Sequence, residues 1–491
     1  MKNYIITIDL GTTNIKVGMY DNDMKEICIF SIGVEYTYKN GFVEFEPEQY
    51  WELCKKGIQN VIKKSKINPK EVLSISLTGQ AESLIIIDDN FIPLRNGISW
   101  MDNRSEKECE LLKNTFDISR GYHITGQPDI IPTWPITKIL WIKKNEKELF
   151  KKVHKFLLLK DFIIFKLTGN FRAEYTIYNF SYYFDIVKKR YWNDILDFVG
   201  IKTEQFPELI EPGEIAGNLV ENVAGEFNFS KDVSVNAGAL DHFAGMIGTG
   251  NIKEGVISET TGTVLAVATL VNHPVINEYK IPCQYNAIRD TYVLMPVCES
   301  GGISLEWFKN NFFPDKSYEY LNKEIAKTIN SANEIIFLPY ITGTNSPEFD
   351  PGARGVFYGI NINHTKIDFA RAVMEGVAYL LYKNIECLEK LNIKTNSIIS
   401  LGGGAKSDVW NQMKADITGK NILIPEYEEA TSLGAAVLAG VKCGFYSSIH
   451  EAIEKNVGIK KTYTPAQRKY YKDGYKKFLQ IYEQLIPVFN S

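Results

Sequence analysis

Residues 4–20, YIITIDLGTTNIKVGMY, indicate the fold class of this chain more directly than any other segment. Two apolar runs rich in β-branched residues, Tyr4–Ile8 and Ile15–Tyr20, flank a short polar segment that contains Gly11, Thr12 and Thr13. Strand-forming runs interrupted by Gly and Thr are typical of a β-hairpin. The segment therefore predicts a hairpin with a polar tip at the N-terminus.

The same order of apolar run, polar tip and apolar run occurs again about half the chain later. Val256–Ser258 precedes the tip Thr260–Thr263, and Val264–Val267 follows it. Strand-like runs elsewhere alternate with runs of helical periodicity, which is typical of α/β proteins. Two related hairpins in 491 residues predict two α/β domains, 1–247 and 248–491, with an active-site cleft between them.

Composition argues against several classes of partner. With 55 basic and 59 acidic residues, the net charge of -4 creates no field that would gather nucleic acid or an anionic membrane. The seven cysteines include no CxxC pair and do not cluster with the six histidines, so we expect reduced thiols and no structural zinc. Neither a signal-peptide core nor an uninterrupted run of 18 apolar residues is present, which predicts a cytoplasmic protein with a small-molecule partner.

Three Gly-rich segments have the chemistry of a nucleotide site. Backbone N–H groups and hydroxyls of the tips at Gly11–Thr13 and Thr261–Thr263 can bind phosphate oxygens. Asp9, at the end of the first strand, can hold magnesium through water or stabilise a turn. The third segment, around Gly403 and Gly404, can admit adenine or ribose, although a glycine run between a strand and a helix is often a simple turn.

Other polar residues could bind and activate a hydroxylated substrate. Asp241, beside the expected domain border, can accept the proton of a substrate hydroxyl, or it can cap a helix. Gln80 and Glu82 can bind vicinal hydroxyls, and Trp100 can cover the apolar face of a polyol or lie in the core. Asp102 and Arg104 can also pair with each other.

Together these segments stand in the order and spacing of the FGGY carbohydrate kinases, and the resemblance spans nearly the whole chain. The most specific match is Gly355–Ile360 followed, after seven residues, by Asp368–Glu375, which is similar to the C-terminal signature of that family. The resemblance implies two actin-like, ribonuclease H-like domains, with ATP and Mg²⁺ between them. It also implies a sugar held by the N-terminal domain and ATP bound by the C-terminal domain.

The resemblance assigns Asp241 as the catalytic base and Gly403 and Gly404 to adenosine. The residues expected at the ATP phosphates and magnesium are Asp9, Gly11, Thr12, Thr13, Lys16, Thr261, Gly262 and Thr263. The residues expected at the substrate are Gln80, Ala81, Glu82, Trp100, Asp102 and Asp241. Asp9 is expected to reach the metal through water.

The residues at positions 80–82 bear on which sugar is bound. Xylulokinases usually show Gln-Met-His, and glycerol kinases Gln-Arg-Glu, where this chain has Gln80-Ala81-Glu82. Lys16 and the course of residues 97–110 and 158–169 resemble the xylulokinase pattern, so we expect a pentulose such as D-xylulose. Another ketose, a polyol, glycerol or gluconate stays open, as do an actin-like ATPase and a noncatalytic sugar sensor. The oligomeric state is open, with a homodimer as one option.

Overall fold

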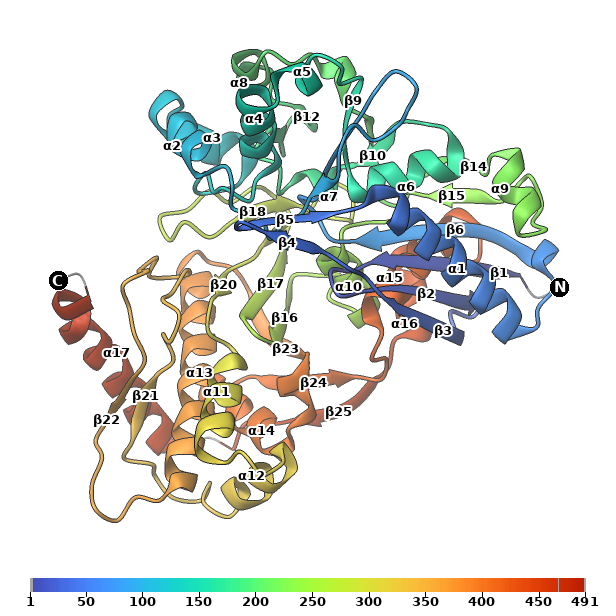
Figure 1. Ribbon diagram of the computed structural model, residues 1–491. Helices are drawn as coiled ribbons and strands as arrows, with labels where there is room; N and C mark the ends of the chain where they lie inside the picture. The colour runs from blue at the N-terminus through green and yellow to red at the C-terminus, as the bar shows by residue number, and fades with distance from the viewer. Residues whose placement is uncertain (1–2, 467, 490–491) are drawn as a thin grey trace. The chain divides into compact units, whose positions relative to one another are not determined.

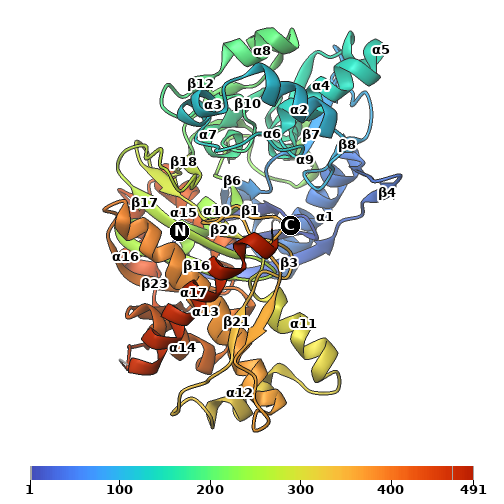
Figure 2. The same cartoon turned by 90° about the vertical axis from the view of Figure 1, so that its left-hand side faces the viewer.

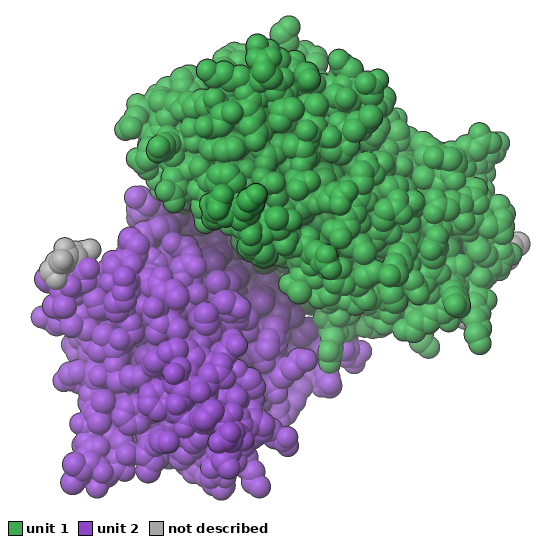
Figure 3. Space-filling model, in the orientation of Figure 1, with its two compact units in different colours: residues 1–252, 283–292, 427–457 green, residues 253–282, 293–426, 458–491 purple. Residues whose placement is uncertain are grey.

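The computed structural model of the chain describes residues 3–466 and 468–489 (Figure 1). These residues divide into two units, coloured separately in Figure 3. Unit 1 consists of residues 1–252, 283–292 and 427–457, and unit 2 consists of residues 253–282, 293–426 and 458–491. Met1, Lys2, Asn490 and Ser491, at the ends of the expected domains, lie outside the described residues.

The predicted N-terminal hairpin is confirmed in unit 1. β1 (Tyr4–Leu10) pairs antiparallel with β2 (Asn14–Asp21), which places Asp9 opposite Lys16. The sheet has the order β14-β15-β6-β1-β2-β3, in which β6 is parallel to both β1 and β15. The other bounds are β3 Glu26–Gly33, β6 Val72–Gly79, β14 Ile215–Asn218 and β15 Ser234–Asn236. Because helices cover both faces, β1 is an almost continuous apolar run rather than an alternating one.

Helices α10 (Asp241–Thr249) and α15 (Ala430–Lys442) pack closely together beside this sheet. A Cβ at Gly248 would lie 1.9 Å from the carbonyl oxygen of Ala430, and a Cβ at Gly434 would lie 1.8 Å from that of Ala244. Glycine therefore allows the two helix backbones to approach. This packing fixes α10, whose first residue is Asp241.

The remaining elements of unit 1 surround the central sheet. A second sheet has the order β4-β5-β8-β7-β9, formed by Thr37–Lys39, Phe42–Phe45, Gly97–Ile98, Leu84–Ile87 and Lys155–Leu158. The longer helices are α1 Pro47–Ser65, α2 Glu106–Thr115, α3 Ile118–Thr125, α4 Pro135–Asn145, α6 Leu159–Thr168 and α16 Ile449–Asn456. α1 contacts β2 and β3, and α15 contacts β1 and β6, so apolar helix faces cover the sheet.

The second predicted hairpin is confirmed in unit 2. β16 (Gly255–Thr261) pairs antiparallel with β17 (Leu265–Val271) and parallel with β23 (Thr395–Leu401). β24 (Asn421–Pro425) follows in parallel, and β25 (Ile459–Tyr463) pairs antiparallel with it. The run β17-β16-β23-β24 thus repeats the run β2-β1-β6-β15 of unit 1.

The helices of unit 2 pack around this sheet. α13 (Lys366–Lys390) begins with a capping box between Thr365 and Asp368 and runs beside β21 (Ile336–Leu338), as Figures 1 and 2 show. The other helices are α11 Ile303–Phe312, α12 Tyr318–Ala326, α14 Asp408–Thr418 and α17 Lys469–Phe489. None of the described helices is long and apolar enough to cross a membrane.

Candidate active site

A cavity of about 180 Å³ in unit 1 gathers most of the predicted substrate residues. It is lined by Thr12, Gln80, Ala81, Glu82, Trp100, Phe180, Leu240, Asp241 and His242. These residues come from segments that are widely separated in the sequence. The phosphate tip at Thr12, the predicted base and the four predicted sugar residues Gln80, Ala81, Glu82 and Trp100 therefore meet in one pocket.

Asp241 is held by a chain of buried hydrogen bonds that ends at the residue before it. The backbone N–H of Leu240 donates to the hydroxyl of Thr176 at 2.8 Å, and Thr176 Oγ1 donates to Glu174 Oε2 at 2.6 Å. Lys160, fully buried, donates both to Glu174 Oε1 and, at 3.1 Å, to the carbonyl oxygen of Ala237. This chain fixes the loop that leads from β15 to α10, and with it the position of the Asp241 carboxylate.

Asp9 and Lys16 lie opposite each other next to the tip of the first hairpin. Lys16 Nζ pairs with both carboxylate oxygens of Glu429, at 2.6 and 2.9 Å. Asp9 Oδ1 is buried and accepts no hydrogen bond from the described residues. Burial, together with the negative charge of Asp241, raises the pKa of Asp9 to about 7. A buried carboxylate oxygen without a donor is a suitable acceptor for a hydrated cation.

Glu82 has an unusual backbone and an unusual ionisation. Its φ of 67° lies in the left-handed region, which a residue with a Cβ rarely adopts outside functional or turn positions. Withdrawal from solvent raises the pKa of its carboxyl to about 8, against the opposing attraction of Lys138. Lys138 is fully buried, donates to the carbonyl oxygen of Ser99 at 2.8 Å, and has a pKa lowered by burial to about 8. The raised pKa favours the protonated form of Glu82 at neutral pH.

Gln80 is oriented by its neighbours rather than free to rotate. Its Nε2 donates to the hydroxyls of Tyr50 and Tyr36, at 3.1 and 3.2 Å, and its Oε1 accepts from Ser83 Oγ at 2.9 Å. The amide is almost completely buried, with 6% of the residue exposed. The oxygen of Gln80 keeps a second lone pair for a substrate hydroxyl.

Asp102 is the predicted substrate residue that does not line the pocket. It is fully buried and accepts from the backbone N–H of Val43 at 2.6 Å. It also forms a two-point ion pair with Arg104, at 2.8 Å to Nε and 2.7 Å to Nη2. The pairing of Asp102 with Arg104, which the sequence left open, is thus present, and it leaves the Asp102 carboxylate facing protein groups.

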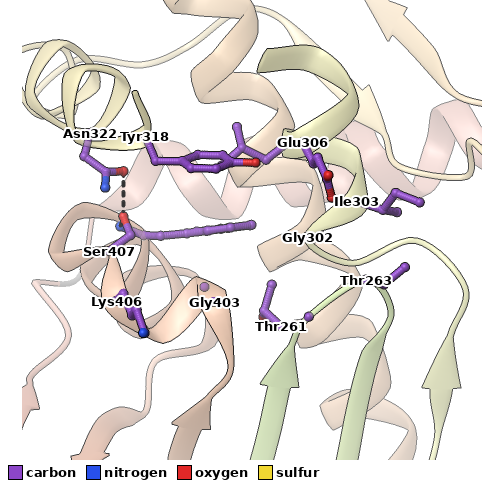
Figure 4. A pocket seen from close by; sticks show the side chains of 14 residues that line it. Thr261, Thr263, Gly302, Ile303, Glu306, Tyr318, Asn322, Gly403, Lys406 and Ser407 are labelled. Atoms are coloured by element: carbon purple, nitrogen blue, oxygen red, sulfur yellow. Dashed lines mark hydrogen bonds between the residues drawn. The ribbon is translucent and has the colours of Figure 1, made fainter. Parts of the chain in front are cut away.

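A second cavity, of about 360 Å³, lies in unit 2 and gathers the predicted nucleotide residues (Figure 4). The β16–β17 tip and the segment Gly403–Lys406 form one side of it, and the ring of Tyr318 lies across from Gly403. Ser407 Oγ donates to Asn322 Oδ1 at 2.8 Å between these two sides. The lining residues are Thr261, Gly262, Thr263, Gly302, Ile303, Leu305, Glu306, Tyr318, Asn322, Gly403, Gly404, Lys406, Ser407 and Trp410.

Several residues at these pockets were not predicted. In unit 1 they are Phe180, Leu240, His242, Glu429, Lys138 and Thr176, and in unit 2 they include Tyr318, Glu306, Asn322, Ser407 and Trp410. The sequence offered one signal for some of them: His242 and Ser407 lie next to segments that contain predicted site residues. Among the described residues, no group of three or more His, Cys, Asp or Glu side chains could hold a metal ion directly.

Models of one protein family match both halves of the chain. The N-terminal domain model of the FGGY family of carbohydrate kinases matches residues 4–248, and the C-terminal domain model of the same family matches residues 255–443. A xylulose kinase of Staphylococcus epidermidis is 33% identical over 99% of this chain and 97% of its own length.

Two solved structures from Lactobacillus acidophilus have the same fold. A ligand-bound xylulose kinase is 28% identical, with a TM-score of 0.92 and coverage of 99% of both chains. A gluconate kinase is also 28% identical, with a TM-score of 0.91 and coverage of 99% of this chain and 98% of its own. The predicted fold class, two α/β domains of the actin-like, ribonuclease H-like type, is confirmed. The cleft between them stays a prediction.

Proposed function

Because the chain belongs to the FGGY family of carbohydrate kinases, and is thus an ATP-dependent sugar kinase, we propose that it phosphorylates the terminal hydroxyl of a neutral pentulose such as D-xylulose. The observation that carries the proposal is one pocket lined by Asp241, Gln80, Glu82 and Trp100. It combines a base, hydroxyl partners and an indole. Each of these groups can serve the binding or activation of a pentulose.

The charges of the unit 1 pocket favour a neutral sugar over an aldonate such as gluconate. Two carboxyl groups, Glu82 and Asp241, line it, whereas none of the described lining residues is Lys or Arg. A substrate carboxylate bound there would meet the charge of Asp241 without a lysine or arginine partner. The gluconate kinase likeness is therefore the weaker guide to the substrate.

The protonated form of Glu82 explains how this residue can serve a ketose. A carboxylate can only accept hydrogen bonds, whereas a carboxylic acid donates one and accepts others. With its pKa raised to about 8, Glu82 can donate to the carbonyl or hydroxyl oxygen of the sugar at neutral pH. We infer that Glu82 takes the place of the histidine that xylulokinases usually carry at this position.

Asp241 is proposed to remove the proton of the attacking hydroxyl. Its Oδ1 accepts from the backbone N–H of His242 at 2.6 Å, so the carboxylate is oriented while its second oxygen is left for the substrate. We propose that Thr12 and Lys16 of unit 1 and the donors of Thr263 of unit 2 stabilise charge on the phosphates. Positioning rather than covalent chemistry supplies most of the rate.

Mg²⁺ fits the unit 1 site through Asp9. The unpartnered, buried Oδ1 of Asp9 is a hard oxygen acceptor of the kind that Mg²⁺ binds directly or through water. When bound, the ion would neutralise negative charge on the ATP phosphates.

Membership of the FGGY family is also the ground on which we infer a cytoplasmic location. A homodimer remains a prediction.

The test measures ADP release with ATP and Mg²⁺ against D-xylulose, other ketopentoses, D-gluconate and glycerol. We expect the highest kcat/KM with a ketopentose, and we expect D241N to lose turnover by at least about a hundredfold while still binding ADP. Fast ADP release without any sugar would instead support an actin-like ATPase. A preference for gluconate would overturn the neutral-sugar argument.

A further inference from the structure

A fully buried ion pair lies directly behind the unit 2 pocket. Lys414, on α14, and Glu259, on β16, are both completely shielded from solvent, and Lys414 Nζ lies 2.6 Å from Glu259 Oε1. Neither residue lines the pocket. A buried pair of this kind gives little net stability compared with apolar side chains of the same size, so its value lies in the geometry that it imposes.

Both members of the pair form hydrogen bonds with the hydroxyl group of Thr261. Thr261 Oγ1 donates its proton to Glu259 Oε2 at 2.7 Å and accepts from Lys414 Nζ at 2.9 Å. Because a hydroxyl has one proton, Thr261 has none left for a phosphate oxygen. The N–H of Gly262 is also engaged, with the carbonyl oxygen of Val264 at 3.1 Å. The hydroxyl of Thr263 forms no hydrogen bond with the described residues and stays available at this tip.

The same cluster extends to the glycine segment on the other strand. Ser400, on β23, donates to Glu259 Oε1, and Asn411 Nδ2 of α14 donates to the carbonyl oxygen of Ala405 at 2.7 Å. A Cβ on Gly404 would lie 2.7 Å from the Cβ of Thr261 and 3.4 Å from Lys414 Nζ. The Thr261 side chain is thus packed between the ion pair and the backbone of Gly404.

We propose that Glu259 and Lys414 are positioning residues of the nucleotide site, which fix Thr261 and thereby hold the β16 tip against Gly403 and Gly404. They set the spacing between the donors of Thr263 and the backbone of Gly403 and Gly404. The proposal rests on the assignment of the unit 2 pocket to ATP. It adds that Thr261 acts through the hydrogen bonds that fix its position, and Thr263 through its donors.

The first test replaces the pair as a unit. In E259L/K414M, apolar side chains of similar length leave no buried charge unpaired, although Thr261 and Ser400 lose their acceptor, so the melting temperature should fall less than in K414M alone. K414M alone leaves a buried carboxylate without its cation and should lower the melting temperature clearly. We expect the double variant to weaken ADP binding in titration calorimetry roughly tenfold, with an unchanged KM for the sugar. Unchanged ADP affinity in a folded double variant would overturn the proposal.

The second test does not depend on the double variant folding. T261V removes the hydroxyl and should weaken ADP binding, whereas T261S keeps it and should bind ADP within about twofold of the unsubstituted protein. T418V is the matched control. It also replaces a buried threonine by valine, and it removes the 2.7 Å hydrogen bond from Thr418 Oγ1 to the carbonyl oxygen of Lys414 without affecting the hydrogen bonds of Thr261. Equal ADP affinities for T261V and T261S would refute the positioning role alone. Failure of the unsubstituted protein to bind ADP would refute the ATP assignment and the inference with it.

Discussion

The indole Nε1 of Trp100 donates a hydrogen bond of 2.9 Å to the hydroxyl of Thr12. Both side chains line the unit 1 pocket, and 38% of Trp100 is exposed. Trp100 belongs to the predicted sugar residues and Thr12 to the predicted phosphate residues. A single hydrogen bond therefore joins a residue proposed to bind the sugar to one proposed to bind phosphate, within one unit.

This bond predicts a coupled effect in W100F. Phenylalanine keeps an aromatic face for the sugar but cannot donate to Thr12, so the KM values for sugar and for ATP should both rise, roughly three- to tenfold. Steady-state kinetics with each substrate varied in turn measure the two values. A change in the sugar KM alone would mean that the contact with Thr12 has no functional role. T12S, which keeps the acceptor, should behave like the unsubstituted protein.

The hydrogen bond between Leu240 and Thr176 predicts that Thr176 positions the base. T176V removes the acceptor of the Leu240 N–H, and we expect kcat to fall roughly tenfold or more, because a misplaced base costs at least about 1.4 kcal/mol in the barrier. T176S should restore kcat, and ADP affinity should not change in either variant. T125V is the control, since Thr125 is also buried and hydrogen-bonded, but its partners are Gly121 and Gln127 rather than Leu240. An equal loss of kcat in T125V would show that the loss in T176V reflects a general loss of stability and not a misplaced base.

The ionisation of Glu82 predicts a pH dependence of sugar use. Because its pKa is raised from 4.5 to about 8, Glu82 is protonated below that pH, and kcat/KM for the sugar should fall as the pH rises through about 8. E82Q carries an amide donor at every pH and should lose this alkaline limb. Lys138 titrates in the same range, since burial lowers its pKa to about 8. A limb that persists in E82Q would assign the titration to Lys138.

The same shift has a defined sign for stability. Between about pH 4.5 and 8, the folded protein holds a proton on Glu82 that the unfolded chain has lost, so this group destabilises the fold increasingly as the pH rises through that window. The melting temperature of E82Q, relative to that of the unsubstituted protein, should therefore rise as the pH increases from 5 to about 8. If the melting temperatures of the two proteins changed in parallel with pH over this range, the raised pKa would be contradicted.

The two glycines of the predicted adenosine segment should respond differently to alanine. A Cβ on Gly403 meets no atom within 4 Å, so G403A should fold normally but place a methyl group at the pocket wall and weaken ADP binding. A Cβ on Gly404 would collide with Thr261, at 2.7 Å, so G404A should also lower the melting temperature. Calorimetry with ADP and thermal melting separate the two effects. Normal ADP affinity in G403A would remove Gly403 from the nucleotide site.

The sequence by itself determined both hairpins, the α/β class and most of the candidate site. Each hairpin joins neighbouring runs, so its apolar strands and Gly/Thr tip are legible within about 20 residues. Asp9, Asp241 and Gly403 could be singled out because each lies near the end of a strand or in the loop after it, where polar groups of an α/β fold gather.

Only the tertiary structure decided which distant residues support that site. Glu429 lies 413 residues from Lys16, Thr176 lies 64 residues from Leu240, and Lys414 lies 155 residues from Glu259. These contacts depend on strand order and helix packing, which bring residues together regardless of their separation along the chain. Composition and periodicity report on neighbours in sequence, so the buried partners that hold Asp241 and Thr261 in place became visible only when the strands were assembled.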